Sequence, residues 1–395
     1  QLSCCFFGRG TAMSSPKSVP VSKASGGSSG PNVPAEMKAV VTRGHGGFEM
    51  LDYTQVKTPV LEGGDVLLKV LAAGVNNTEI NTRLGWYSKT VKSATNEQSD
   101  NTQEVETGGW SGATPFPLIQ GTDCCGEVVA ASPGFSGLVG KRVLVRCTMR
   151  GPKGFASYEN KWMASDFDGA FAQFVRIPGD EVFPVNCSWS DAELASIPCA
   201  YGTAENMVER ARVGPGSRVV VPGASGGVGS AVLQLCKRRG AHVTAICGPG
   251  KEAAIKELGA DQVFVGRHGS SSWPGIVETL RGGADVVIDN VGGPAFADML
   301  DILIQGGRYA TSGAISGPVV DLDLRTLYLK DLTLIGTTAW DECVMPNLVS
   351  YIEKGELKPL VSRTFPLSEI VLAQQTLLKR EHVGKLVLIP PPIEM

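Results

Sequence analysis

The feature that most constrains the fold of this chain is a glycine-rich loop between an apolar strand and a helix-forming stretch. The strand Val219–Val221 precedes the loop, and SAVLQLCKRRG follows it with helical periodicity. The loop consists of Gly223, Ala224, Ser225, Gly226, Gly227, Val228 and Gly229. Glycine lets a backbone turn sharply and approach a bound group closely, and a helix N-terminus offers free N–H groups to a phosphate. All seven residues are therefore predicted to hold a dinucleotide pyrophosphate.

The sequence after this loop alternates between apolar strands and helices. HVTAIC, DQVFV, DVVIDNV, GGRYATSG and LTLIGTT are expected strands, and KEAAIKELG and AFADMLDILI are expected helices between them. Continuous apolar strands that alternate with helices are typical of a parallel sheet covered on both faces. Residues 191–344 are therefore predicted to form a doubly wound, Rossmann-type domain, which makes the chain an α/β protein.

The rest of the chain is expected to form one further domain. MKAVV, VLLKVLAAGV, CCGEVVAA and KRVLVRC are short β-type runs that predict a β-rich domain over residues 37–190. Residues 345–395 contain two expected helices and the final strand GKLVLIP, and they are too few to fold alone. We therefore expect them to return to the β-rich domain.

Two segments have the composition of chain without a packed core. Residues 1–36 contain eight serines, three basic residues and one acid, which predicts a disordered extension. The same composition suits an organelle targeting segment, so a cytoplasmic and an organellar location both stay open. Residues 88–115 are polar and lie directly after Tyr87, where a loop of this length is either a surface insertion or a lid.

Composition excludes several classes of partner. The net charge is -3 and no basic stripe is present, which argues against a nucleic-acid partner. No apolar run reaches the ~18 residues of a membrane span. The ten cysteines include the pair Cys124 and Cys125 but no CxxC spacing, which predicts reduced, buried thiols.

The strand after the glycine-rich loop bears on the choice between NAD and NADP. An NAD site places a carboxylate about 20 residues past the loop, where it accepts from the ribose 2′-OH. This chain reads HVTAICGPGKE there, with Gly248 at the strand end and Lys251 after it. Lys251 is suited to a 2′-phosphate and no carboxylate takes the NAD position, so the sequence predicts NADPH.

Several motifs resemble the medium-chain dehydrogenase/reductase superfamily, and within it the zinc-independent quinone oxidoreductase and enoyl reductase branch. They are AAGVNNTEINTRLGWY, PLIQGTDCCGEVVA, GAFAQFVRIP, IPCAYGTAENM, DVVIDNVGG and HVGKLVL. The resemblance covers about residues 37–395. It implies that the β-rich domain is GroES-like and catalytic, that the active site lies between the two domains, and that the protein is a homodimer.

The resemblance also predicts that no metal is bound. Zinc members of the superfamily bind the ion with a Cys after a GV pair, a His in a GHE motif, and a later Cys or carboxylate. Here Asn76 and Thr122 stand at the first two positions, and the third region near Leu194–Ser196 has no Cys. A catalytic zinc site needs three such protein ligands. None of the four histidines lies at a ligand position.

The resemblance assigns roles to individual residues. Without a metal, hydrogen-bond donors must stabilise the charge on the substrate oxygen, and an acid must supply a proton. Tyr87, in Gly85-Trp86-Tyr87, is the implied acid, with a packing role as the alternative. Asn76 is the residue implied to orient the substrate or the nicotinamide amide, with a turn-capping role as the alternative. The further implied cofactor contacts are Thr203, Asn290, Ser312, Gly313, Thr337 and Lys385.

Together these inferences predict an NADPH-dependent oxidoreductase that reduces a quinone or an α,β-unsaturated carbonyl. Two alternatives stay open: a relative of the zinc-type alcohol dehydrogenases, and a non-catalytic NADPH-binding protein. Tyr309 and Tyr328 are expected to pack in the core rather than to contact the cofactor.

Overall fold

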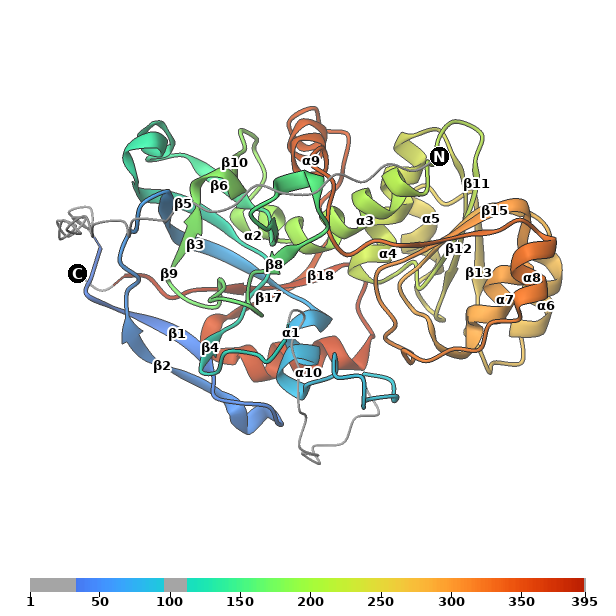
Figure 1. Cartoon of the computed structure of the whole chain (residues 1–395), viewed down its shortest axis with the longest axis horizontal. Helices are drawn as coiled ribbons and strands as arrows, with labels where there is room; N and C mark the ends of the chain where they lie inside the picture. The colour runs from blue at the N-terminus through green and yellow to red at the C-terminus, as the bar shows by residue number, and fades with distance from the viewer. Residues whose placement is uncertain (1–32, 96–111, 394–395) are drawn as a thin grey trace, which may run out of the picture.

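The computed structural model describes residues 33–95 and 112–393 of the chain. A β-rich half built mainly from the start and the end of the chain lies beside a half formed by the middle of the chain (Figure 1). The expected N-terminal extension lies almost wholly outside the described residues, as does most of the polar stretch 88–115. No helix in the described ranges is long and apolar enough to cross a membrane.

The middle of the chain forms a six-stranded, fully parallel sheet in the order β13-β12-β11-β14-β15-β16. Its strands are β11 (Arg218–Pro222), β12 (His242–Cys247), β13 (Gln262–Val265), β14 (Ala284–Asp289), β15 (Leu303–Thr311) and β16 (Thr333–Gly336). The accompanying helices are α4 (Gly227–Arg238), α5 (Glu252–Glu257), α6 (Trp273–Leu280), α7 (Phe296–Asp301) and α8 (Leu324–Leu329). The strand order reverses between β11 and β14, and nucleotides bind at such a switch point, beyond the carboxyl ends of the strands. The predicted Rossmann-type fold is confirmed.

The β-rich half contains a three-stranded sheet, a seven-stranded sheet and a small hairpin. The first sheet consists of β1 (Glu36–Thr42), β2 (Leu51–Lys57) and β4 (Leu118–Ile119). The second consists of β3 (Asp65–Val75), β5 (Cys125–Ala131), β6 (Arg142–Val145), β9 (Phe174–Pro178), β10 (Val182–Pro184), β17 (Val361–Pro366) and β18 (Lys385–Ile389). The hairpin pairs β7 (Thr148–Arg150) with β8 (Asn160–Trp162), and the helices are α1 (Asn77–Leu84), α2 (Asp191–Ala195) and α10 (Ile370–Lys379). Short 3₁₀ turns lie at Phe48–Met50, Pro133–Leu138, Gly154–Ala156, Gly179–Glu181, Gly293–Ala295 and Leu367–Glu369.

The end of the chain pairs with a strand from its beginning. β18 runs antiparallel to β3, with Leu386 opposite Val75 and Leu388 opposite Ala73. β17, which the sequence did not lead us to expect, runs parallel to β18. This pairing brings Lys385, the first residue of β18, to the carboxyl end of β3.

Two helices lie between the halves (Figure 1): α3 (Pro198–Arg210) and α9 (Val344–Glu353). They are joined by a hydrogen bond from Asn347 Nδ2 to Glu205 Oε1 of 3.0 Å. Glu205 is fully buried and forms an ion pair with Arg239 at 2.8 Å. One hydrophobic core continues from the β-rich half through α3 into the parallel sheet. The N-terminus of α3 is thereby held at the junction where the candidate site lies.

Candidate active site

A fully buried carboxylate, Asp123, is the centre of a polar cluster at the junction of the two halves. Its Oδ1 accepts from the backbone N–H of Cys199 at 2.6 Å, in the first turn of α3. Its Oδ2 accepts from Asn76 Nδ2 and from Lys385 Nζ, both at 2.9 Å. A Cβ at Gly74 would lie 2.3 Å from Oδ2, so only glycine allows the carboxylate to sit against β3. Three donors compensate the burial of this charge.

Lys385 supplies the positive charge of the cluster. Its ammonium donates to Asp123 Oδ2, to the carbonyl oxygen of Val75 at 3.1 Å, and to Asn76 Oδ1. Burial alone lowers the pKa of this lysine, but the charges of Asp123, Cys199 and Glu79 and the hydrogen bond to Asp123 hold its pKa above the ordinary value. The side chain is 5% exposed, so this is a charged, buried ion pair with all three N–H donors used.

The contacts of Asn76 determine which way its amide faces. Oδ1 must face the ammonium of Lys385, and Nδ2 must face the carboxylate of Asp123, because the reverse arrangement would place like partners together. The amide nitrogen has two hydrogens, and Asp123 takes one. Asn76 is 9% exposed. Among the described residues, Asp123 Oδ2 is the acceptor of Nδ2, so no protein group there takes the second hydrogen.

Glu79, in the first turn of α1, forms the second buried carboxylate of the cluster. It accepts from the backbone N–H of Asn76 at 2.7 Å, and from the N–H and the hydroxyl of Thr122 at 2.9 and 2.5 Å. Burial raises the pKa of Glu79, while the hydrogen bonds from Thr122 and the charge of Lys385 oppose that rise. Thr122 thus binds Glu79 from the position that the zinc members use for a histidine ligand.

Tyr87 lies beside this cluster because α1 ends in a reversal. Gly85 caps the helix with a φ of +67°, a left-handed conformation that favours glycine. The chain then returns along α1, and the Tyr87 phenol forms hydrogen bonds with Asn81 and Thr78. Burial raises the pKa of Tyr87, and its neighbours Cys199 and Glu79 raise it further. The phenol therefore keeps its proton at neutral pH and lies close to the Asn76 site. We call Asn76, Glu79, Tyr87, Asp123 and Lys385 the junction cluster.

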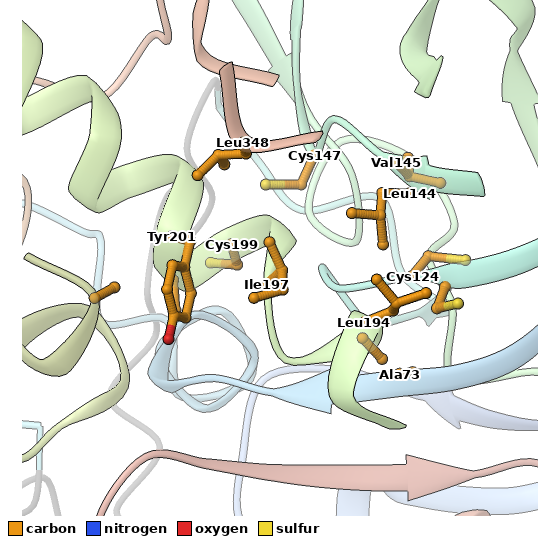
Figure 2. Packing of buried hydrophobic residues seen from close by; sticks show 14 of the residues in the cluster. Ala73, Cys124, Leu144, Val145, Cys147, Leu194, Ile197, Cys199, Tyr201 and Leu348 are labelled. Atoms are coloured by element: carbon orange, nitrogen blue, oxygen red, sulfur yellow. The ribbon is translucent and has the colours of Figure 1, made fainter. Parts of the chain in front are cut away.

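Two thiols that were not predicted to be functional adjoin the junction cluster. Figure 2 shows Cys199 between Tyr201 and Ile197, with Cys147 on the side toward Leu348. Burial raises the pKa of Cys147 well above its usual range, and a hydrogen bond with Cys199 raises it further. Such a thiol is protonated and unreactive.

The sequence patterns did not single out Cys199, whose backbone N–H the structure brings to Asp123. The motif IPCAYGTAENM contains Cys199, but its spacing does not show which residue of the helix start faces Asp123. In the described part of the chain, no three His, Cys, Asp or Glu side chains are arranged as a metal-ligand set.

The glycine-rich loop joins β11 to α4 as predicted. Gly223 has a φ of +64°, and a Cβ at Gly229 would lie 2.3 Å from the Gly223 carbonyl oxygen. Gly226 is the N-cap of α4, and no side-chain hydrogen bond caps that helix. The first N–H groups of α4 are therefore available to a ligand. The loop therefore lets its backbone approach a pyrophosphate closely and offers N–H donors to it.

The other predicted cofactor residues gather at the carboxyl ends of the strands. Ser312, after β15, donates from Oγ to Asn290 Oδ1 at 2.6 Å, and Gly313 follows it. Thr337, after β16, donates from its N–H to the Thr311 carbonyl oxygen at 3.1 Å. Thr203 is buried in α3. The neighbouring Gly202 lies against the ring of Trp340, which would be 2.1 Å from a Cβ at that position.

Lys385 lies between the junction cluster and the glycine-rich loop. The resemblance implies a cofactor contact, but the ammonium is bound within the junction cluster. Only the aliphatic stem approaches the loop, where Cδ lies 2.8 Å from the position of a Gly227 Cβ. Gly248 and Lys251 lie after β12, beside the loop.

The described part of the polar stretch reaches across to the parallel-sheet half. The Trp86 indole donates to the carbonyl oxygen of Ser93 at 3.0 Å, which holds the segment against the end of α1. The Thr95 N–H then donates to the carbonyl oxygen of Ile315 at 3.1 Å, in the loop after β15. The segment that follows Tyr87 therefore links the two sides of the site.

Comparison with known proteins identifies the superfamily. Residues 62–187 match the family described as alcohol dehydrogenase GroES-like domain, and residues 227–354 match the family described as zinc-binding dehydrogenase. A solved structure described as a "putative alcohol dehydrogenase" from Sinorhizobium meliloti 1021 is 42% identical, with 91% of this chain and 98% of that chain covered and a TM-score of 0.81.

Two characterised relatives match over most of their length. Acryloyl-coenzyme A reductase of Metallosphaera sedula is 28% identical over 366 residues, which is 89% of this chain and 99% of that protein. The mitochondrial NAD(P)H oxidoreductase RTN4IP1 of Mus musculus is 27% identical, over 85% of this chain and 84% of that protein. The chain is an oxidoreductase that belongs to the medium-chain dehydrogenase/reductase superfamily.

Proposed function

We propose that this protein uses NADPH to reduce an α,β-unsaturated carbonyl compound or a quinone without a catalytic metal. The observation that carries the proposal is the fixed amide of Asn76, held by Lys385 and Asp123 with one N–H that no described protein group uses, near the protonated phenol of Tyr87. A donor left unused by the protein and a nearby acid are what reduction of a conjugated carbonyl requires. The resemblance to acryloyl-coenzyme A reductase supports the same substrate class.

The residues at the switch point fit a reduced dinucleotide. The loop Gly223–Gly229 and the first turn of α4 would hold the pyrophosphate. Asn290, Ser312 and Thr337, at the strand ends, would face the nicotinamide side. Cys247 and Gly248 rather than a carboxylate stand at the end of β12, and Lys251 follows, which supports NADPH over NADH. When bound, the cofactor supplies a hydride.

The junction cluster supplies the remaining chemistry. As hydride adds to the β-carbon of a conjugated carbonyl, negative charge develops on the carbonyl oxygen, and the second N–H of Asn76 would donate to that oxygen. Tyr87 Oη would then deliver a proton to the α-carbon. Lys385 and Asp123 hold Asn76 in place without touching the substrate, because their own donors and acceptors are already used.

The donor set argues against a zinc mechanism. Of the three superfamily ligand positions, the first two hold Asn76 and Thr122, and the third region near Leu194–Ser196 has no Cys. A neutral amide and a hydroxyl are poor replacements for thiolate and imidazole. A buried ammonium, Lys385, already contacts Asn76 and supplies positive charge there. Metal analysis of the purified protein should find less than one zinc per chain.

A steady-state panel tests the proposed function. NADPH and NADH would each be assayed with an enoyl thioester, a simple enone and a quinone. An aliphatic alcohol would be assayed separately with the oxidised cofactor. We expect NADPH to exceed NADH by about 10-fold or more in kcat/KM, and the conjugated carbonyls or quinone to be reduced. Alcohol oxidation that depends on zinc would overturn the proposal. NADPH binding without turnover of any acceptor would favour the non-catalytic alternative.

We also propose a homodimer formed through the edge of the parallel sheet. β16 is the edge strand, and edge strands present unpaired backbone groups to another chain. Exposed apolar side chains surround it, and Tyr328 is one of them, so the expectation that it packs in the core was wrong. Their exposed fractions are 64% for Val319, 64% for Leu324, 61% for Tyr328, 65% for Leu329 and 38% for Leu334.

A second copy is the occupant that fits this edge, because two β16 strands can pair across a twofold axis and cover both apolar surfaces. Sedimentation velocity should show a dimer for the wild type and a monomer for Leu329→Lys combined with Leu334→Lys. Val139→Lys, a similar change at an exposed residue of the β-rich half, is the matched control and should leave the dimer intact. A wild-type monomer would contradict the prediction.

A further inference from the structure

The β7–β8 hairpin of the β-rich half carries a buried arginine that reaches into the parallel-sheet half. Arg150 is the last residue of β7, and only 5% of its side chain is exposed. Its guanidinium lies over the ring of Phe155, 5.1 Å from the ring centroid. A planar guanidinium is attracted to the face of an aromatic ring, so this contact holds the side chain in one orientation.

The two ends of the guanidinium bind backbone from different parts of the chain. Nη1 donates to the carbonyl oxygen of Ser157 at 2.9 Å, within the same hairpin, and Nη2 donates to the carbonyl oxygen of Trp340. Trp340 follows β16, and the carboxylate of Asp341 beside it lies 3.9 Å from the same Nη2. Arg150 therefore joins the β-rich half to the chain that leaves the parallel sheet.

The chain that leaves the sheet, residues 336–341, is also bound by a side chain of α3. Asn206 Nδ2 donates to the carbonyl oxygens of Thr337 and Ala339, at 3.1 and 3.3 Å. This segment begins at the carboxyl end of β16, the end of the strands beyond which nucleotides bind in such sheets. Its course past the proposed cofactor site is therefore determined by donors from α3 together with Arg150.

We propose that Arg150 is a positioning residue, which holds the nicotinamide end of the cofactor in place for hydride transfer. It acts through the Trp340 carbonyl oxygen on residues 336–341, and so on Thr337 at the nicotinamide side of the proposed site. The inference rests on the proposed function and extends it: hydride transfer would depend on a residue of the β-rich half that touches neither cofactor nor substrate. A displacement of about 1 Å at a reacting centre lowers a rate by about 100-fold.

Single-turnover reduction of an enone by the full chain tests the proposal. NADPH oxidation would be followed by stopped-flow absorbance for the wild type, Arg150→Met and Arg150→Lys. Methionine keeps an apolar stem beside Phe155 but has no donor, so the hydride-transfer rate should fall by about 10-fold or more. Lysine keeps a donor for the Trp340 carbonyl oxygen and should recover a large part of the rate. Calorimetry should show unchanged affinity of both variants for adenosine 2′,5′-bisphosphate, which contains only the adenosine half of the cofactor.

Arg146 provides a matched control for the loss of a buried, stacked arginine. Its side chain is 6% exposed and lies over the other contact of the same ring, 5.0 Å from the Phe155 centroid. Its carboxylate partner is Glu181, at 3.4 Å, rather than a residue of the segment 336–341. Arg146→Met should therefore lower the thermal stability about as much as Arg150→Met does and leave the hydride-transfer rate unchanged.

The outcomes separate this inference from the proposed function. A hydride-transfer rate at the wild-type level in Arg150→Met would overturn the inference. An equal fall in Arg146→Met, or weakened bisphosphate binding in Arg150→Met, would assign Arg150 a general structural role and overturn it as well. If the wild type reduces no acceptor, the proposed function fails and calorimetry decides the inference: NADPH should lose affinity in Arg150→Met while the bisphosphate does not. Unchanged NADPH affinity in that case would end both.

Discussion

Lys385→Met is expected to lower the free energy of unfolding by about 3–5 kcal/mol, because it leaves the carboxylate of Asp123 buried without its counter-ion. Asp123 is 0% exposed, and Lys385 is the cation within hydrogen-bond distance of it in the described structure. Methionine fills nearly the same volume as the lysine stem beside Gly227, so the loss comes from the charge rather than from a cavity. Urea denaturation followed by circular dichroism would measure it, with an unchanged m-value.

A double variant separates the charge from the packing. Lys385→Met combined with Asp123→Asn removes both charges, and the new amide can still accept from Cys199 N–H. It should recover a large part of the loss, which makes the interaction energy of the pair strongly non-additive. Lys379→Met, at an exposed position of α10, is the control and should change stability by less than about 0.5 kcal/mol. A loss below about 1 kcal/mol for Lys385→Met would contradict the buried ion pair.

The ion pair between Lys385 and Asp123 also determines in which direction stability changes with pH. The pKa of Lys385 is raised in the folded protein, so the stabilisation linked to its proton is present below the ordinary lysine pKa of 10.5 and is lost as pH rises through the folded value. The stability difference between the wild type and Lys385→Met should therefore stay constant near neutral pH. It should shrink only in strongly alkaline solution.

Tyr87→Phe is expected to reduce enone turnover by about 100-fold or more, because the α-carbon then has no positioned acid. Phenylalanine keeps the ring and its edge-on contact with Trp86, whose centroid lies 5.6 Å away. KM for the enone and the affinity for NADPH should change little, since the hydroxyl acts on the reacting carbon. Steady-state kinetics with saturating NADPH would give kcat and KM separately.

A quinone provides an internal comparison for this variant. Reduction of a quinone ends with protonation of oxygen, which water carries out rapidly, so Tyr87→Phe should affect quinone reduction much less than enone reduction. Tyr158→Phe makes the same change at a tyrosine that is 73% exposed and should leave both rates unchanged. Enone turnover that stays at the wild-type rate in Tyr87→Phe would assign the phenol a packing role, the alternative left open by the sequence.

The sequence alone determined the parts of this protein that depend on neighbouring residues. The strand, loop and helix around Gly223–Gly229 follow from local rules, since the tight turn needs glycine and the helix must begin at once. The alternation of apolar strands and helices in residues 191–344 likewise predicts a parallel sheet covered by helices. Asn76 and Tyr87 could be assigned to the same site because only one short helix, α1, separates them in the chain.

The tertiary structure alone decided the contacts between distant segments. Lys385 and Asn76 are 309 residues apart, and only the pairing of β18 with β3 makes them neighbours. The sequence did not indicate the contacts of Lys385 with Asp123 and Asn76, nor the place of Cys199, because side-chain direction at a strand end or helix start is set by packing and not by spacing. The hydrogen bond from Lys251 Nζ to the backbone carbonyl oxygen of Arg380 has the same origin, because only the fold brings these two segments together.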